Sequence, residues 1–181
     1  LKDSFTPIAQ VVFDPSGIVV PVDSPFKTLD DLIKAAKENP GSISWGGTML
    51  GGAHHIHALI LEREAGIKLT YIPFDGLSEI KTAILGGNID VGASGMSGWT
   101  ELINEGKLRS LAFAGINRID AIPDVPTYTE LGYAVQTGSN RGYSVASGTP
   151  KERVDLLTNT IKEVLESPEF LAEAEKLGMA H

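Results

Sequence analysis

The hydrophobic positions of this chain follow two different spacings, one typical of strands and the other of helices. Residues 18–22, "IVVPV", are apolar at every position, as in a strand buried on both faces. After Thr28 the apolar residues recur at helical spacing, and Asp31 is placed to complete an N-terminal cap. These apolar residues are Leu29, Leu32, Ile33 and Ala36. The pattern therefore predicts an α/β protein.

Predicted strands and helices alternate along most of the chain. The strands are 5–13, 18–22, 42–46, 67–74, 89–94 and 107–115, with a turn at Asp14–Gly17 between the first two. The helices are 29–38, 54–65, 77–85 and 98–105, followed near the C-terminus by one that starts at Pro150 after the cap Thr149 and another at "SPEF". The helix after Pro150 should bury a stripe of Val154, Leu157, Ile161 and Leu165. Such alternation indicates βαβ units and a mostly parallel sheet.

Composition excludes several classes of partner and chemistry. The 23 acidic and 15 basic side chains give a net charge of −8, which disfavours binding to nucleic acid or anionic lipid. The absence of cysteine excludes disulfides, thiolate metal sites and a cysteine nucleophile. No apolar run is long enough to span a membrane, and no signal peptide is present. Because the chain starts at Leu1, we expect it to be processed or cut from a longer chain, so the missing leader is no evidence for the cytoplasm.

Three loops follow strands whose C-terminal ends should share one edge of the parallel sheet. They are "GGTMLGGAHH" at 46–55, "PFDGLSE" at 73–79 and "GASGMSG" at 92–98. Their glycines permit close backbone approach, their hydroxyls can donate hydrogen bonds, and each following helix end favours an anion by about 0.3–1 kcal/mol. The hydroxyls belong to Thr48, Ser78, Ser94 and Ser97. Together the loops indicate an anion site; the alternative is that they are tight turns whose hydroxyls cap helices.

Known phosphate and metal motifs do not fit these loops. Gly51 is followed by Gly52-Ala53, where a P-loop would need Lys and then Ser or Thr, and no GxGxxG spacing occurs. His54 and His57 have the spacing of metal ligands but lack an acidic third ligand at a matching offset. We therefore expect neither a metal nor a cofactor.

The histidines are expected to have other roles. His54 or His55 should lie at the helix start and donate a hydrogen bond to the loop or to a ligand, while His57 packs or faces solvent. No GxSxG motif and no sequence-adjacent pairing of a nucleophile with a base occurs, so the motifs neither indicate nor exclude catalysis.

Arg141 stands in a Gly-Ser-Asn context, "QTGSNRGYSV". Its guanidinium could hold a carboxylate through two parallel hydrogen bonds. The alternative is a solvated arginine or a structural ion pair.

Eight phrases in order along nearly the whole chain carry a family resemblance. They are "FTPIAQV", "IVVPVDSPFKTLDDLIKAAKENPGSISWG", "GGAHHI", "LTYIPFDG", "ILGGNIDVG", "INEGKLRSLAFAG", "IPDVPTYTELGY" and "SGTPKERVDLL". The chain closely resembles the periplasmic solute-binding proteins of tripartite tricarboxylate transporters, the Bug or TctC-like family.

The resemblance implies a periplasmic-binding-protein-like, type II α/β fold with two lobes, a Venus flytrap. Residues 22–138 would form one complete lobe, and 1–21 with 139–181 part of the other. Such proteins capture a small carboxylate between the lobes and deliver it to a membrane permease; the ligand is a di- or tricarboxylate, an amino acid or an aromatic acid. The resemblance implies a periplasmic protein without catalysis, which we expect to be a monomer.

The resemblance also implies the ligand contacts. They are Gly47, Thr48, Gly51, Gly52, Ala53, His54, Asp75, Gly76, Ser94, Gly95, Ser97, Ser139, Asn140 and Arg141.

Three departures from the family pattern affect this expectation. Relatives carry an additional N-terminal βαβ portion before the equivalent of Leu1, so the N-terminal part of one lobe is expected to be missing. A loop that commonly reads "PYKGG" is here "PFDGL", which replaces a cation by Asp75, and a loop that often begins Asp-Asn is here "SGMSG". Asp75 would favour a smaller, amidated or partly cationic ligand, unless it faces outward.

Two other classes of function stay open at this point. One is a cytoplasmic ligand-sensing regulatory domain of similar fold, which would need a DNA-binding segment. The other is a small carboxylate-processing enzyme that uses Asp75, His54 or His55, and Arg141.

Overall fold

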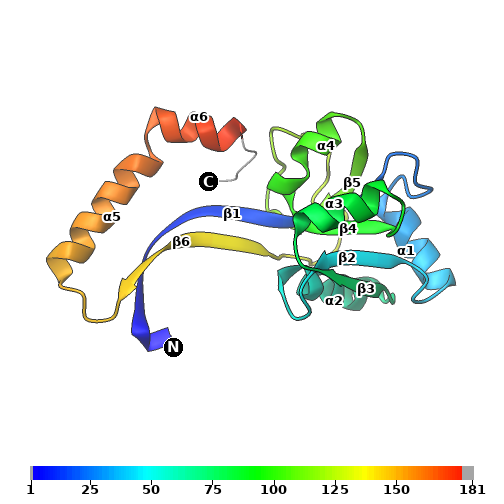
Figure 1. Cartoon of the computed structure of the whole chain (residues 1–181), viewed down its shortest axis with the longest axis horizontal. Coiled ribbons are helices and arrows are strands. Elements are labelled where there is room, and N and C mark those ends of the chain that lie inside the picture. Colours follow the sequence, from blue (N-terminus) through cyan, green and yellow to red (C-terminus); the bar gives the residue numbers. More distant parts are fainter. Residues whose placement is uncertain (1, 177–181) are drawn as a thin grey trace. The chain divides into compact units, whose positions relative to one another are not determined.

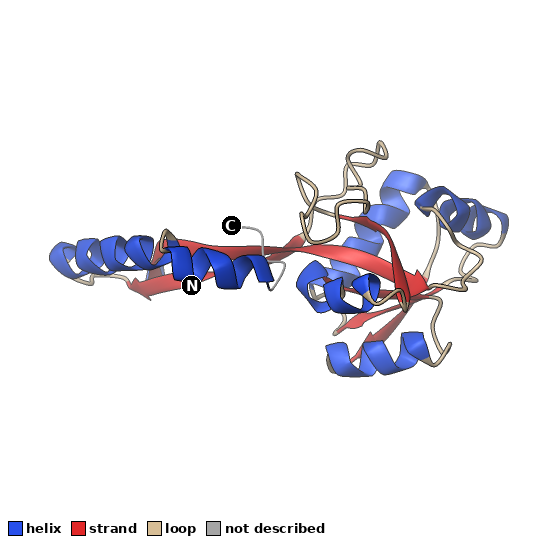
Figure 2. Cartoon of the chain, turned by 90° about the horizontal axis from the view of Figure 1, so that it is seen from above, coloured by secondary structure: helices blue, strands red, loops and turns tan. Residues whose placement is uncertain are grey.

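The computed structural model describes residues 2–176, which divide into two units (Figures 1 and 2). The larger unit is Pro15–Ser139, and the smaller one comprises Leu1–Asp14 and Asn140–His181. In the described part of the chain, no helix is both long enough and apolar enough to cross a bilayer.

The larger unit is built on a mixed sheet with strand order β3-β2-β4-β1-β5. These strands are β1 (Phe5–Pro21), β2 (Ser44–Thr48), β3 (Thr70–Phe74), β4 (Val91–Gly95) and β5 (Leu108–Phe113). Strand β2 runs parallel to β3 and β4, whereas β1 is antiparallel to both β4 and β5. The predicted parallel arrangement therefore holds for the strands that precede the three candidate loops.

Helices cover both faces of this sheet. They are α1 (Leu29–Glu38), α2 (Ala53–Ala65), α3 (Leu77–Leu85), the 3-10 helix η2 (Met96–Gly98) and α4 (Thr100–Asn104). Alternate residues of β1 point to opposite faces: Ile18 packs into the core cluster of α1 and α2, and Val19 into the cluster of α3 and η2. Trp45 is fully buried in the first cluster and Trp99 in the second.

The prediction of a turn at Asp14–Gly17 is wrong, because β1 runs through these residues as one strand. The Ser16 N–H donates to the Thr137 carbonyl at 3.0 Å, and the Ser16 carbonyl accepts from Ala114 N–H at 2.8 Å. A Cβ on Gly17 would overlap the Met96 sulfur. The glycine thus serves a close approach inside the sheet and not a turn.

The predicted cap of α1 is confirmed. The Thr28 hydroxyl accepts a hydrogen bond from the Asp31 N–H at 3.2 Å, and the Asp31 carboxylate accepts from the Thr28 N–H at 2.9 Å. Hydrogen bonds to its carboxylate, from the Thr28 side chain and from the Thr28 and Lys27 N–H groups, lower the pKa of Asp31.

The smaller unit contains η1 (Lys2–Ser4), the first part of β1, most of β6 (Gly138–Ala146), α5 (Lys151–Leu165) and α6 (Pro168–Lys176). Strand β6 pairs with β1. Helix α6 begins where "SPEF" predicts it. Pro150, however, is the N-cap of α5 and not its first residue, and the Thr149 hydroxyl donates to the Ala146 carbonyl.

The expected burial of the α5 stripe is also wrong. No residue of α5 is buried, and Leu157 is 42% exposed. An apolar stripe is buried only where another layer packs on it, and α5 packs on the short α6 without becoming buried.

Candidate functional site

The edge of the larger unit's sheet brings the three predicted loops together. Strands β3, β2 and β4 are adjacent, and the register pairs Thr48 with Phe74 and Gly46 with Gly92. Because β2 is parallel to both neighbours, the three strands end on the same side. The β2–α2, β3–α3 and β4–η2 loops therefore leave from one edge.

Two imidazoles hold the β2–α2 loop. His54 Nδ1 lies 2.9 Å from the Thr48 hydroxyl oxygen, and His55 Nδ1 accepts the Gly51 N–H at 3.0 Å. The Tyr71 hydroxyl, from β3, donates to the Thr48 carbonyl. His54 and His55 lie at the start of α2 as predicted; His55 accepts a hydrogen bond from the loop through Nδ1, and donation by either ring to the loop or to a ligand stays a prediction.

The glycine amides of this loop are already engaged. Gly51 adopts the left-handed region at φ 78° and donates its N–H to His55, while the Gly52 N–H donates to the Met49 carbonyl at 3.1 Å. Gly47 is buried, and a Cβ there would meet His54 and Tyr71. These glycines shape the loop, and ligand contact by their amides stays a prediction.

The start of α2 suits an anion better than the start of α3. Gly52 caps α2 without a side chain, and the first turn of α2 carries no acidic residue. Gly76 likewise caps α3 without a side chain, but Glu79 lies in its first turn and accepts the Asp75 N–H at 3.1 Å. A helix N-terminus carries a partial positive charge, and of these two helix starts the one at α2 has no acidic side chain to compensate it.

The remaining loop residues differ in their exposure to solvent. Asp75 is exposed, Ala53 and Ser97 are partly buried, and Ser94 is 8% exposed at the end of β4. Gly95 is the N-cap of η2.

His57 packs inside the larger unit, which was one of its two expected placements. It is fully buried, with Nε2 at 2.9 Å from the Tyr128 hydroxyl oxygen and its ring edge-on to Trp45 at a centroid distance of 5.1 Å. Burial, and secondarily the charge of His54, lowers the pKa of His57 to about 3. Among the residues whose structure is described, no three His, Asp or Glu side chains gather as metal ligands would.

The predicted contacts on β6 fall in different units: Ser139 in the larger, Asn140 and Arg141 in the smaller. Arg141 Nη1 lies 3.8 Å from Asp14 Oδ2, and the Asp14 side chain is 6% exposed. The arginine thus forms the structural ion pair that its sequence context left open, and its role as a carboxylate clamp stays a prediction. Asp14 was missed because its place in a continuous strand was read as a turn.

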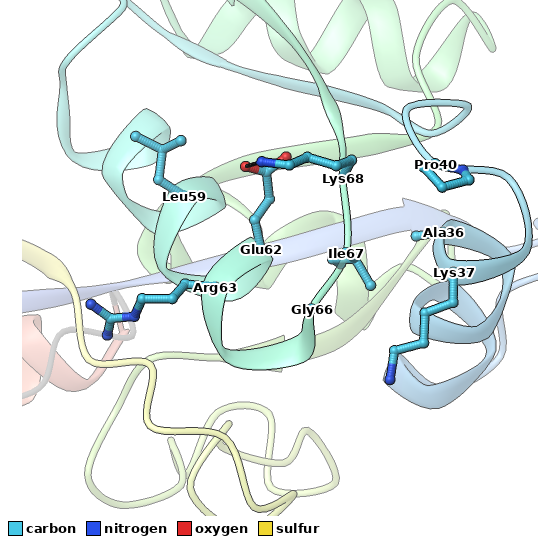
Figure 3. A pocket seen from close by; sticks show the side chains of 9 residues that line it. All are labelled: Ala36, Lys37, Pro40, Leu59, Glu62, Arg63, Gly66, Ile67 and Lys68. Atoms are coloured by element: carbon cyan, nitrogen blue, oxygen red, sulfur yellow. Dashed lines mark ion pairs between the residues drawn. The ribbon is translucent and has the colours of Figure 1, made fainter.

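A hollow of about 570 Å³ lies at the opposite end of α2 (Figure 3). Its lining consists of Ala36, Lys37, Pro40, Leu59, Glu62, Arg63, Gly66, Ile67 and Lys68. The carboxylate in this lining belongs to Glu62 and already has structural partners. It accepts the Leu69 N–H at 2.7 Å and pairs with Lys68 at 3.6 Å. We therefore place the candidate site at the loop edge and not in this hollow.

Comparisons with known proteins point to one family over nearly the whole chain. A family model described as "Tripartite tricarboxylate transporter family receptor" matches residues 2–181. A UPF0065 protein of Cupriavidus necator is 32% identical over 163 residues, which cover 90% of this chain and 50% of that protein. BugT of Bordetella pertussis is 29% identical, with 91% of this chain and 51% of that protein covered. The chain thus spans about half the length of these curated relatives.

Solved structures confirm the predicted periplasmic-binding-protein-like α/β fold. A TctC solute-binding protein from Polaromonas is 29% identical with a TM-score of 0.84, covering 98% of this chain and 61% of that one. The periplasmic binding protein BugD is 30% identical with a TM-score of 0.81, covering 97% and 59%. MatC from Rhodopseudomonas palustris, solved with bound malate, has a TM-score of 0.82 at 24% identity, covers 98% and 61%, and shows the fold alone.

Proposed function

Because this chain belongs to the family of tripartite tricarboxylate transporter receptors, we propose that it is a solute-binding protein for a small carboxylate-bearing ligand. The family consists of solute-binding receptors and not enzymes, so the enzyme alternative is set aside. The same match favours a transport receptor over a regulatory domain. Since the chain spans about half of its relatives, the ligand, its delivery to a membrane permease and a periplasmic location are all parts of the proposal.

One observation carries the carboxylate assignment: α2 starts at the shared loop edge with neither a side-chain cap nor an acidic first turn. The Gly51 and Gly52 amides are engaged inside the loop, so the Ala53 N–H at the first position of α2 is the amide best placed to donate outward. A carboxylate oxygen accepts such bonds and is favoured by the helix dipole. We assign this edge, carried by the complete lobe 22–138, as the ligand-binding wall.

The charges around the edge narrow the ligand class. None of the three loops carries Lys or Arg, whereas Asp75 lies in the β3–α3 loop and Glu79 in the first turn of α3. A ligand with several negative charges would be repelled there, because uncompensated like charges raise the free energy of the complex. We therefore favour a ligand with one carboxylate at α2 and an uncharged or cationic group toward Asp75, such as an amino acid or a half-amide.

The test is calorimetric titration with citrate, succinate, glutamate and terephthalate. It should be run on this chain and on a version extended to the length of its relatives. Binding by the extended version alone would show a carboxylate site that needs residues outside this chain. If neither version binds any of these acids, the carboxylate proposal is wrong for these ligands.

A substitution at Ala53 tests the role of α2. Proline is tolerated at the first position of a helix but has no N–H, so Ala53→Pro deletes one donor and leaves α2 able to form. Loss of a hydrogen bond to a charged group should weaken binding roughly tenfold or more. The matched control Ala53→Ser keeps the N–H and should bind as the unmodified chain does. Equal affinity of the proline variant would place the carboxylate elsewhere.

A further inference from the structure

We propose that His55 is a positioning residue of this site, which fixes the β2–α2 loop through its Nδ1 atom without contacting the ligand itself. The inference rests on the proposed function, since it concerns the loop that would hold the carboxylate.

A closed set of contacts ties the loop to α2 and β3. Gly51 N–H donates to His55 Nδ1 at 3.0 Å, and the His55 ring lies against Tyr71 with a centroid distance of 4.5 Å and an interplanar angle of 51°. The Tyr71 hydroxyl donates to the Thr48 carbonyl, and the Thr48 hydroxyl contacts His54 Nδ1 at 2.9 Å. The loop is therefore held near both of its ends by side chains from two neighbouring elements.

The direction of the Gly51 bond fixes the chemical form of His55. A backbone N–H can only donate, so Nδ1 must carry its lone pair and the proton of the neutral ring lies on Nε2. A doubly protonated imidazole has no acceptor and would release Gly51. Tyr71 is the donor at the other end of the loop. Burial raises the pKa of its hydroxyl to about 12, so the hydroxyl keeps the proton that it donates to the Thr48 carbonyl.

The bond matters because the loop would otherwise be free to move. Its tip exposes Met49 and Leu50, at 69% and 65%, and Gly51 occupies a left-handed conformation in which a Cβ would meet no neighbouring atom. Packing does not hold the exposed tip, so hydrogen bonds fix it: the Gly52 N–H donates to the Met49 carbonyl, and the Gly51 N–H donates to His55. A loop already ordered before binding loses less conformational freedom when the ligand arrives.

Two substitutions separate the nitrogen atoms of His55. Asparagine places its amide oxygen near the position of Nδ1 and can accept the Gly51 N–H, whereas glutamine places its amide near Nε2. Positioning through Nδ1 predicts that His55→Asn keeps the loop order and ligand affinity of the unmodified chain, whereas His55→Gln and His55→Ala lose both. Direct donation to the ligand from Nε2 predicts the reverse order for Asn and Gln.

Two measurements distinguish positioning from direct donation. They use this chain, or the version extended to the length of its relatives if only that version binds a ligand. The first is ligand-independent: ¹⁵N NMR should show the His55 proton on Nε2, and Gly51 amide exchange should accelerate about fivefold to tenfold in the Gln and Ala variants. The second is the affinity for glutamate, which should fall by a similar factor in these variants and by less than about threefold in the Asn variant. Ile56→Ala, an exposed neighbour on α2, is the control and should change neither readout.

The outcomes distinguish the two proposals. If the NMR results are as expected and no carboxylate binds any version, His55 fixes the β2–α2 loop as proposed and the proposed function is wrong. If the proton lies on Nδ1, or if Gln preserves binding and Asn does not, the positioning role is wrong whatever the ligand. Unchanged exchange and affinity in all three His55 variants would also overturn it.

Discussion

Acidification should destabilise the larger unit through His57. The side chain is fully buried, and burial lowers its pKa from the ordinary 6.5 to about 3. In the folded protein the ring therefore stays neutral, whereas in the unfolded chain it takes up a proton below pH 6.5. Between these two values the unfolded state binds one more proton, so stability falls as the pH falls.

The size of this effect follows from the two pKa values of His57. Each pH unit within the window lowers the free energy of unfolding by about 1.4 kcal/mol. Full stability is present above about pH 6.5, so lowering the pH from 7 to 5 should remove about 2 kcal/mol through this one residue.

The assay is urea unfolding at pH 7 and pH 5, followed by tryptophan fluorescence. The chain's two tryptophans, Trp45 and Trp99, are both fully buried in the larger unit, so they report its unfolding. The comparison protein is the double variant His57→Leu with Tyr128→Phe, which removes the imidazole without leaving the buried tyrosine hydroxyl unpaired. Measurements stop at pH 5, where carboxylates such as Asp31, whose pKa is lowered, remain ionised.

The unmodified chain should lose about 2 kcal/mol more than the double variant between these pH values. Equal losses in the two proteins would refute the reasoning, because they would show that His57 does not bind its proton differently in the two states.

Two further substitutions test features of the fold. Gly17→Ala should destabilise the chain by about 1–3 kcal/mol, because its Cβ would overlap the Met96 sulfur. At Gly76 the same group meets open space, so Gly76→Ala should cost less than about 1 kcal/mol, through the poorer N-cap that alanine gives α3. Thermal unfolding of the two variants checks both expectations. Thr28→Ala removes one half of the α1 capping box and should cost about 1 kcal/mol in urea unfolding, and no change would show that Asp31 alone supports this end.

Elements with local signals could be predicted from the sequence. The cap of α1 needs only residues three apart, and α3 begins and ends at the predicted residues Leu77 and Leu85. The prediction of a turn at Asp14–Gly17 failed because Pro and Gly occur both in turns and in strands. Gly17 is needed here because a Cβ would overlap the side chain of Met96, which is distant in sequence, so no local pattern could reveal that contact.

The candidate site divides in the same way. The gathering of three loops at one edge follows from the parallel order of their strands, which hydrophobic spacing predicts. The partners inside the loop do not follow, because Tyr71 comes from β3 and reaches Thr48 only through the folded sheet. The sequence also left open which of His54 and His55 bonds to the loop, because it shows two histidines near a helix start but not that the Gly51 N–H faces His55 Nδ1.

The β2–α2 loop combines two residue types with opposite effects on order. Gly51 lets the chain turn through a left-handed conformation, but glycine also leaves an unbound loop many alternative conformations. His54 and His55, placed next to each other at the first turn of α2, reduce that freedom by bonding back to Thr48 and Gly51. His55, whose Nδ1 accepts the Gly51 N–H, does so without adding a charge beside the helix end. The carboxylate would therefore meet backbone dipoles that the loop holds in place, at an edge where Asp75 is already acidic.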